Sequence, residues 1–284
     1  MLNFNEQLDT LVKAALQEDI GEGDHSTLSC IPPNAPGKAI LKIKQDGILA
    51  GVAVAEKIFM MQEPSAKFIF FKKDGDQMTA GENAFEVEAA VWTILQCERV
   101  VLNCMQRMSG IATLTRQYVE KIKGFKTKIL DTRKTTPNFR LLEKEAVTIG
   151  GGTNHRFGLY DMIMLKDNHI DYGGGIEKAI QKASAYVHSK NLDLKIEIET
   201  RNIDEVKRVI AVGKVDRVML DNFSPPQIEE ALKIINGKYE TEASGGINLD
   251  NIIDFAKTGV DFISIGALIH QAKSLDLSLK AMMI

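Results

Sequence analysis

The most constraining feature of the sequence is the regular order of apolar strand, polar loop and amphipathic helix in its second half. This pattern predicts six strands, at 127–132, 161–165, 194–198, 217–220, 239–243 and 262–265. It also predicts helices between strands, for example at 176–190, 203–212, 226–235 and 249–257. Strands that alternate with helices at this spacing form right-handed crossovers and a parallel sheet. The second half therefore folds as an α/β barrel or as a doubly wound sheet.

Two observations favour the barrel. The first helix does not open with GxGxxG, the glycine pattern of doubly wound dinucleotide-binding sheets. Polar or glycine-rich residues follow every strand: Arg133 and Lys134, Lys166 and Asp167, Glu199, Asp221, Ser244–Gly246, and Gly266. In barrels the catalytic groups gather at such carboxyl ends of strands. Because six units fall short of the usual eight, we expect a smaller barrel or further strands that the pattern misses.

The first hundred residues predict a separate, small α+β unit. Apolar residues at helical spacing over 4–19 indicate an amphipathic helix. Short β-prone runs follow at 39–43, 67–72 and 85–91. A helical pattern over 91–123, with a break expected near Ser109 and Gly110, then leads into the second half. We place the domain boundary at this break.

Composition and charge argue against several classes of protein. The chain has 284 residues, 44% hydrophobic and 26% charged, as in soluble globular proteins. No apolar run approaches the roughly 20 residues that span a bilayer, and the first ten residues lack a signal-peptide pattern, so we expect a cytoplasmic protein. The net charge of -3 argues against nucleic-acid binding. Three cysteines without CxxC spacing indicate neither a disulfide framework nor a zinc site.

Basic residues gather between Asp131 and His169, around the ends of predicted strands. Each of them alone lies on a solvated surface as often as in a site. Together they predict a basic pocket in a mildly acidic protein, because the planar fork of arginine matches a carboxylate or phosphate bidentately. Such a pocket suits a polyanionic small molecule. The set consists of Arg133, Lys134, Arg140, His155, Arg156, Lys166 and His169.

Acidic residues occupy the next strands. Alternation along 195–199 points Glu197 and Glu199 into the barrel, where buried carboxylates need partners. We expect Glu197 to form a structural ion pair, and Glu199, nearer the strand end, to meet the substrate. Asp221 ends its strand in the same way and can face sugar hydroxyls or a developing positive charge; the case for Asn222 is weaker.

Glycine-rich turns follow the last two strands. The segments 244–246 and 264–266 each end a strand and precede a helix, where backbone N–H groups can hold a phosphate. Barrels often place a phosphate in these last loops. For the GGG segments at 150–152 and 173–175, a role as helix terminators is an equally good explanation.

These motifs, taken in order, resemble the quinolinate phosphoribosyltransferases along nearly the whole chain. The combination is far more specific than any single motif. The matching segments are Glu98–Thr113, DTRKTTP from Asp131, GGGTNHRFGLYDMIMLKDNH from Gly150, EIE from Glu197, LDNFSP from Leu220, EASGGIN from Glu242 and GVDFISIGALIH from Gly259.

The resemblance implies an enzyme that transfers phosphoribosyl from phosphoribosyl pyrophosphate to quinolinate. Decarboxylation then gives nicotinate mononucleotide, pyrophosphate and CO2, as a step of NAD biosynthesis with Mg²⁺ as cofactor. It also implies a homodimer with shared active sites, built from an N-terminal α+β sandwich domain and an incomplete TIM-like α/β barrel of about seven strands. We place these domains at 1–110 and 111–269, and expect a helix at about 270–284 that packs back on the first domain.

The family pattern also assigns site residues, position by position. Substrate binding falls to Arg99, Thr132, Arg133, Lys134, His155, Arg156, Lys166, Glu199 and Asp221, and catalysis to Glu199, Asp221, Lys134 and Lys166. Phosphate binding falls to Ser244, Gly245, Gly246, Ser264, Ile265 and Gly266. No metal ligand is assigned. The sequence departs from the pattern at Asn138, where glycine is usual, and at Glu145 and Thr148, which puts local packing in doubt.

Two rival interpretations remain at this point. One is the related protein found with molybdate transport, which shares parts of the barrel pattern but is disfavoured by the full segment from Asn154 to His169. The other is a catalytically silent anion-binding barrel. A binder shows saturation with quinolinate without releasing pyrophosphate, so a turnover assay separates it from an enzyme.

Overall fold

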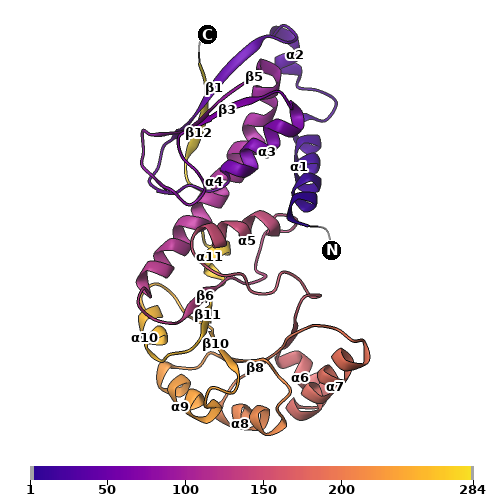
Figure 1. Cartoon of the computed structure of the whole chain (residues 1–284), viewed down its shortest axis with the longest axis vertical. Coiled ribbons are helices and arrows are strands. Elements are labelled where there is room, and N and C mark those ends of the chain that lie inside the picture. The colour runs from indigo at the N-terminus through magenta and orange to yellow at the C-terminus, as the bar shows by residue number, and fades with distance from the viewer. Residues whose placement is uncertain (1–2, 283–284) are drawn as a thin grey trace. The chain divides into compact units, whose positions relative to one another are not determined.

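The computed structural model describes residues 3–282, and the chain divides into two compact units. Unit 1 comprises the chain up to Arg116, Thr135–Gly151 and the segment from Leu268 onward. Unit 2 comprises Gln117–Lys134 and Gly152–Ala267. Figure 1 labels the elements of both units along the chain.

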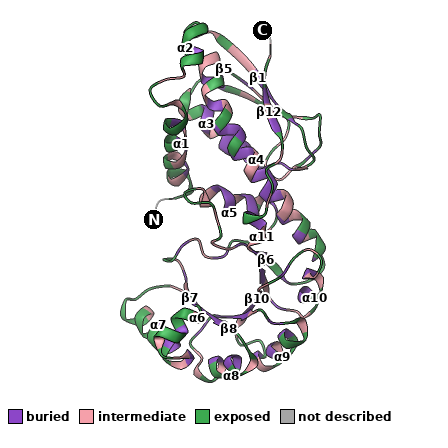
Figure 2. Cartoon of the chain, turned by 180° about the vertical axis from the view of Figure 1, so that it is seen from behind, coloured by how far each residue is buried: buried purple, intermediate pink, exposed green. Residues whose placement is uncertain are grey.

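Unit 1 is built on a four-stranded antiparallel sheet in the order β12-β1-β5-β3. The strands are β1 (Pro36–Ile43), β3 (Lys67–Phe70), β5 (Asn83–Ala90) and β12 (Leu277–Met282), and a small ribbon pairs β2 (Gly47–Ile48) with β4 (Gln77–Met78). Its helices are α1 (Phe4–Ile20), α2 (His25–Cys30), α3 (Val52–Gln62) and α5 (Arg140–Ile149). Figure 2 shows buried residues, in purple, on helices α3 and α5 of this unit.

The opening helix confirms the amphipathic pattern. Asn3 caps α1 in a capping box with Glu6, which satisfies backbone N–H groups that have no partner within the helix. The side chains of Leu8, Val12 and Leu16 are buried on one face. The predicted helix therefore begins and ends within one residue of the observed one.

The helix expected at about 270–284 is wrong. After the short helix α11 (Ala267–His270) the chain forms strand β12, antiparallel to β1. Leu277 and Leu279 are only 2% and 5% exposed and alternate with polar residues, a period of two that no helix presents. The segment does return to the first unit, but as a strand. Met283 and Ile284 lie outside the described residues.

The break expected near Ser109 and Gly110 is also absent, because α4 runs unbroken over Val91–Lys121. The Ser109 hydroxyl bonds to the backbone N–H and C=O of Ala50. A Cβ at Gly110 would collide with the carbonyl oxygen of Lys273, so this glycine permits close packing and does not end the helix. No helix within residues 3–282, α4 included, is long and apolar enough to cross a membrane.

Unit 2 is a six-stranded parallel sheet in the order β6-β11-β10-β9-β8-β7. The strands are β6 (Lys128–Leu130), β7 (Ile163–Leu165), β8 (Ile196–Thr200), β9 (Arg217–Asp221), β10 (Glu240–Ser244) and β11 (Phe262–Ser264). All six predicted strands are confirmed. Thr153 forms a single parallel bridge with Leu130 beyond β6, so a seventh segment joins the sheet without forming a strand. The expected incomplete α/β barrel is thus confirmed, with six strands and this bridge where about seven strands were expected.

Helices cover the convex side of this curved sheet (Figure 1). They are α6 (Asp167–Gly173), α7 (Ile176–Ser189), α8 (Ile203–Val212), α9 (Pro225–Ile235) and α10 (Ile252–Lys257). Ile196 and Ile198 of β8 are buried, as are Val206 and Val209 of α8, which form the apolar layer between sheet and helices. The alternate residues of the strands therefore face the barrel interior.

The three departures from the family pattern lie in or just before α5 of unit 1. Asn138 has φ 62°, in the left-handed region that glycine adopts freely and asparagine tolerates best among other residues. Burial and the nearby charge of Asp74 raise the pKa of Glu145. The Thr148 hydroxyl donates to the carbonyl oxygen of Lys144 within α5. Each replacement is accommodated without disturbing its element.

Candidate active site

The carboxyl ends of the parallel strands of unit 2 bring the predicted site residues to one edge of the sheet. Thr132 to Lys134 follow β6 and Lys166 follows β7. Glu199 and Asp221 lie at the ends of β8 and β9, and the segments 244–246 and 264–266 at those of β10 and β11. Barrel active sites lie at this edge. Arg99 lies elsewhere, exposed on α4 in unit 1.

The buried carboxylate of Asp131 organises the basic side of the site. Its Oδ1 accepts the backbone N–H of His155 at 2.8 Å, and the Thr153 N–H donates to the carbonyl oxygen of Ile129 at 2.8 Å. These bonds hold the segment 152–155 beside β6. The Thr132 hydroxyl accepts the backbone N–H of Lys134 at 3.1 Å, which shapes the turn after the strand.

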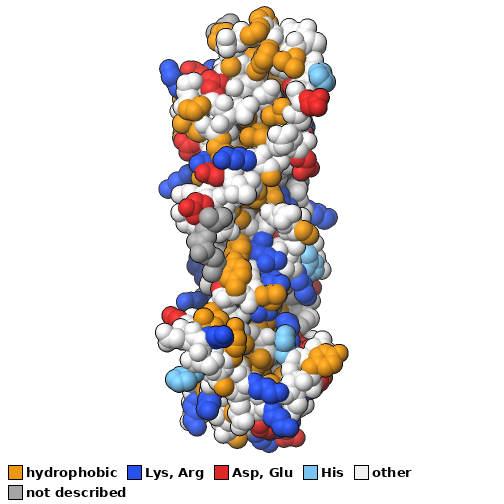
Figure 3. Space-filling view, turned by 90° about the vertical axis from the view of Figure 1, so that its right-hand side faces the viewer, with side chains coloured by type: hydrophobic (Ala, Val, Ile, Leu, Met, Phe, Trp, Pro, Cys, Tyr) orange, Lys and Arg blue, Asp and Glu red, His pale blue; other side chains and the backbone are white. Residues whose placement is uncertain are grey.

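Two guanidinium groups meet in this region. Nη1 of Arg156 donates to the carbonyl oxygen of Met162 at 3.2 Å. Burial and the charge of Arg133 lower the pKa of Arg156. Nε of Arg133 is buried and has no hydrogen-bond partner among residues 3–282. Neighbouring cations of this kind, with a buried N–H that lacks a partner, attract an anion with several acceptor atoms. Figure 3 shows that Lys and Arg side chains outnumber acidic ones over the lower half of one face.

Two further basic residues of the predicted pocket have local partners. Nε of Arg140 donates to the hydroxyl of Thr135 at 2.9 Å, and both residues belong to unit 1. Nδ1 of His169 accepts the backbone N–H of Lys166 at 3.1 Å and so caps α6. These contacts explain both residues without a substrate.

The acidic side of the site is linked to the basic side by one ion pair. Nζ of Lys166 lies 3.4 Å from Oε2 of Glu199, which is 9% exposed. Burial raises the pKa of Glu199, Lys166 opposes this shift, and the charge of Asp221 adds to it. Oδ2 of Asp221 accepts a hydrogen bond from Nδ2 of Asn222 at 2.6 Å. Asn222, which the sequence favoured only weakly, thus orients the second carboxylate.

The turn after β10 is shaped by glycine. Gly245 and Gly246 have φ 95° and 64°, and a Cβ on Gly245 would collide with Oδ1 of Asn222. Only glycine fits there, because it combines a positive φ with no side chain. In the next turn the Ile265 N–H donates to the carbonyl oxygen of Leu130 at 3.0 Å, so it completes the sheet and does not point to a ligand.

A cluster of buried charged residues lies inside the barrel, next to these strand ends. Nε2 of His155 lies 2.9 Å from Oε2 of Glu197 and 3.3 Å from Oε2 of Glu242. Nη1 of Arg217 donates to the same Glu242 oxygen at 3.0 Å. The sequence motifs assigned no role to Glu242 or Arg217. Side chains alternate along a strand, so Glu242, two residues before Ser244, and Arg217, four before Asp221, lie on the inward face. This alternation is the signal that could have identified them.

The three side chains of His155, Glu197 and Glu242 hold their ligand atoms within 4.8 Å of one another, as a metal site does. Arg217, however, already supplies a positive charge at 3.0 Å from Glu242. A divalent cation placed beside this guanidinium would be repelled. The cluster therefore fits a network of ion pairs better than a magnesium site, which prefers oxygen ligands and water.

Comparisons with known proteins find relatives along nearly the whole chain. The family model described as Quinolinate phosphoribosyl transferase, N-terminal domain, matches residues 24–109, and that of the C-terminal domain matches residues 111–280. A chloroplastic nicotinate-nucleotide pyrophosphorylase [carboxylating] from Arabidopsis thaliana is 44% identical, over 96% of this chain and 82% of its own. A probable nicotinate-nucleotide pyrophosphorylase [carboxylating] from Bacillus subtilis is 43% identical, over 96% and 93%.

A solved structure gives the same result for the fold. The crystal structure of NadC from Streptococcus pyogenes is 42% identical and superimposes with a TM-score of 0.91, over 100% of this chain and 99% of that one. Both domain models, the curated relatives and the solved structure thus point to one family across both units. The chain belongs to the quinolinate phosphoribosyltransferase family.

Proposed function

We propose that this chain makes nicotinate mononucleotide at the carboxyl edge of the unit 2 sheet, with the residues assigned above. The reaction is that of its family, the transfer of phosphoribosyl from phosphoribosyl pyrophosphate to quinolinate with decarboxylation. One observation carries the assignment of the site. Cationic Arg133 and Arg156, which follow β6 and precede β7, interact electrostatically, and so do the carboxylates of Glu199 and Asp221 at the ends of β8 and β9.

The basic side suits quinolinate. Its two adjacent carboxylates match the two guanidinium groups of Arg133 and Arg156, and the imidazole of His155 contacts the backbone N–H of Arg156. A dianion offsets the mutual repulsion that lowers the pKa of Arg156. Lys134 and Lys166 are exposed and long enough to reach the pyrophosphate-bearing sugar.

The acidic side suits the ribose. Loss of pyrophosphate leaves an oxocarbenium-like sugar, and Glu199 and Asp221 can stabilise its positive charge electrostatically. The 5-phosphate is expected in the turns 244–246 and 264–266. Supporting this, the N–H groups of Gly245 and Gly246 donate no hydrogen bond to another described residue.

The bond changes then follow from charge. The pyridine nitrogen attacks the anomeric carbon as the bond to pyrophosphate breaks, which gives a cationic ring. When the adjacent carboxylate departs as CO2, its bonding electron pair stays on the ring carbon, where the positive nitrogen beside it stabilises the pair, and a proton then binds to it. Magnesium, when bound with phosphoribosyl pyrophosphate, screens the leaving pyrophosphate. We assign it no protein ligand.

Three further properties complete the proposal. The enzyme works as a homodimer in which Arg99 of each subunit completes the site of the other, as the resemblance implies. It works without nucleic acid or membrane. We place it in the cytoplasm, which suits the similarity to a bacterial protein, although several plant relatives are named chloroplastic or mitochondrial.

A turnover assay with quinolinate, phosphoribosyl pyrophosphate and Mg²⁺ tests the proposal. Release of CO2 and of pyrophosphate in equal amounts is expected, and it should depend on all three components. Saturable quinolinate binding without release of either product would identify a silent binding barrel instead.

A further inference from the structure

The interior of the unit 2 barrel is charged where barrels usually hold branched apolar residues. Glu197, Arg217 and Glu242 are 0%, 8% and 0% exposed and come from the adjacent strands β8, β9 and β10. An uncompensated buried charge costs several kcal/mol. These side chains must therefore neutralise one another, with the help of His155.

His155 completes the charge balance. Arg217 and the two carboxylates sum to one negative charge, so a single additional proton makes the cluster neutral. Buried and flanked by both carboxylates, the imidazole is the group placed to take up this proton: burial lowers its pKa, but the hydrogen bonds to Glu197 and Glu242 outweigh burial and raise it to about 9. Burial and the charge of Glu242 raise the pKa of Glu197 to about 7.

Charged and polar groups surround the imidazole from every neighbouring strand. They are Glu197 from β8, Arg217 from β9, Glu242 from β10, Ser264 from β11, Asp131 after β6 and the adjacent Arg156. Nε2 faces the two carboxylates. Nδ1 accepts the backbone N–H of Arg156 at 2.6 Å, so it carries no proton while this contact lasts. Nδ1 is thus the atom on the side of the arginine loop and of the expected substrate.

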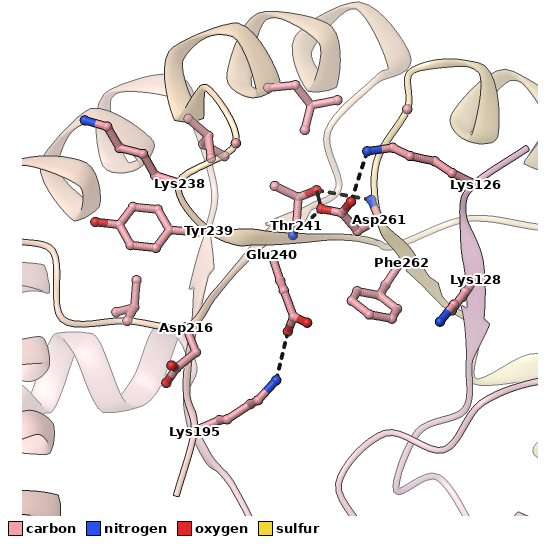
Figure 4. A pocket seen from close by; sticks show the side chains of 15 residues that line it. Lys126, Lys128, Lys195, Asp216, Lys238, Tyr239, Glu240, Thr241, Asp261 and Phe262 are labelled. Atoms are coloured by element: carbon pink, nitrogen blue, oxygen red, sulfur yellow. Dashed lines mark hydrogen bonds and ion pairs between the residues drawn. The ribbon is translucent and has the colours of Figure 1, made fainter.

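Arg217 is itself held by residues at the amino ends of β10 and β11. Its Nη2 donates to Oε2 of Glu240 at 3.0 Å, and its guanidinium lies 4.1 Å from the centroid of the Phe262 ring. Figure 4 shows Glu240 extending toward Lys195, 3.4 Å away, at a cavity of about 810 Å³ around the amino ends of the strands. A guanidinium anchored in this way cannot turn away from Glu242.

We propose that Arg217 and Glu242 are positioning residues for His155. Arg217 fixes the Glu242 carboxylate, and Glu242 with Glu197 holds Nε2 of the imidazole. When the ring is protonated, the contact with the Arg156 N–H is lost, and Nδ1 becomes a hydrogen-bond donor to one carboxylate of quinolinate. This inference rests on the proposed role of His155 in binding quinolinate.

The experiment follows the imidazole directly. In NMR spectra, full-length protein with isotope-labelled histidine rings has five histidine signals. The signal that disappears in His155→Asn is that of His155. The His155 signal of the wild type should titrate well above the ordinary value of about 6.5. Glu242→Gln should move the titration to lower pH by at least about one unit, and Arg217→Gln should move it to higher pH, because each removes one neighbouring charge.

Steady-state kinetics then separate a specific effect on the position of His155 from a general loss of structure in the site. Glu242→Gln should raise KM for quinolinate by about tenfold or more, with a change below about twofold in KM for phosphoribosyl pyrophosphate. The matched control is Glu205→Gln, which also neutralises a buried glutamate bonded to an arginine, but on α8 outside the barrel. It should move neither the His155 titration nor either KM.

The outcomes separate the positioning role from the contact with quinolinate. A wild-type His155 that titrates at or below about 6.5, or one that Glu242→Gln leaves unmoved, overturns the positioning role. A titration that moves as expected while KM for quinolinate stays constant keeps the positioning role and removes His155 from the quinolinate site. If Glu242→Gln does not fold, the wild-type and Arg217→Gln titrations still decide.

Discussion

The ammonium of Lys166 and the carboxylate of Glu199 lie 3.4 Å apart across the ends of β7 and β8. The lysine is exposed and the glutamate is nearly buried, so the pair stands at the border between solvent and the barrel interior. A ligand with a negative charge on the lysine side and a positive charge on the glutamate side would replace this ion pair with two contacts of its own. The sugar of phosphoribosyl pyrophosphate becomes such a ligand as its pyrophosphate leaves.

Glu199→Gln and Asp221→Asn should lower kcat more than they raise KM. Both carboxylates are proposed to face a charge that exists only as the sugar bond breaks, so their loss affects the transition state first. A fall in kcat of about 100-fold is in the range for one such group. Steady-state kinetics measure it, with Asp204→Asn on the exposed surface of α8 as the control. An unchanged kcat with a raised KM would reduce both residues to substrate binding.

Nicotinate should be a very poor substrate compared with quinolinate. It lacks the carboxylate beside the ring nitrogen and would leave one of the buried cations around Arg133 and Arg156 without a partner. The ratio of the two kcat/KM values should exceed about 10³. Sites that bind a polar group of the substrate reject an analogue without this group by at least such a factor. Comparable kcat/KM values for the two acids would contradict the assignment of this pocket.

Mixed dimers test the shared site. Arg99→Ala and Lys134→Ala should each be nearly inactive as homodimers. After the two variants are mixed and allowed to exchange subunits, each heterodimer has one site with both defects and one intact site. Random pairing should then restore activity towards about a quarter of wild type. No recovery, with heterodimers confirmed by mass, would place Arg99 in its own subunit's site or outside the site.

Thermal stability should fall as the pH rises from about 7 to 9. The neighbouring carboxylates raise the pKa of His155 to about 9 despite its burial, compared with about 6.5 in the unfolded chain. The folded protein therefore binds more protons in this window, and the stability from His155 is complete below about pH 6.5 and lost by about pH 9. A pKa difference of one between the folded and unfolded chain is worth about 1.4 kcal/mol, so the midpoint should fall by roughly 5 °C or more.

The control for this pH dependence is its slope in two variants. His155→Asn should flatten the fall of the midpoint between pH 7 and 9, whatever its effect at a single pH. His25→Asn, which changes an exposed histidine on α2, should retain the slope of the wild type. Equal slopes in all three proteins would show that His155 does not carry the effect.

Two glycines of one turn should respond differently to alanine. Gly246→Ala meets no atom within 4 Å, so it should cost only the roughly 1–2 kcal/mol of a positive φ. Gly245→Ala adds a collision with Asn222 and should cost more, and it should also weaken binding of phosphoribosyl pyrophosphate through the displaced turn. Unfolding in urea and KM measure the two effects. Equal losses would mean that the Asn222 contact is unimportant.

The strands of unit 2 could be predicted because each is a short apolar run bounded by polar turns. The alternation within 195–199 also predicted the inward direction of Glu197 correctly. Strand β12 was missed although Leu277 and Leu279 alternate with Ser278 and Lys280, because a pairing with β1, far away in the sequence, is not visible locally. Gly110 suggested a break in α4, but its requirement for space comes from Lys273, a tertiary neighbour.

The same limit applies to the site. Motifs identified the residues at the strand ends, since each follows directly from its own segment. The buried cluster depends on register between strands, which brings Glu197 opposite Arg217 and Arg217 opposite Glu240. No single segment carries that information, so Arg217 and Glu242 became visible only in the folded sheet.

The pairing of β12 with β1 sets an order of events during protein synthesis. The ribosome completes all the strands of unit 2, which end at Ser264, before it adds Leu277–Met282. Unit 2 can therefore fold while β1 still has one unpaired edge. Such an edge is a template for pairing with other chains, so the nascent protein is most prone to aggregate in this interval. Strand β12, made after unit 2, covers the edge of β1 and becomes the edge strand of the finished sheet in its place.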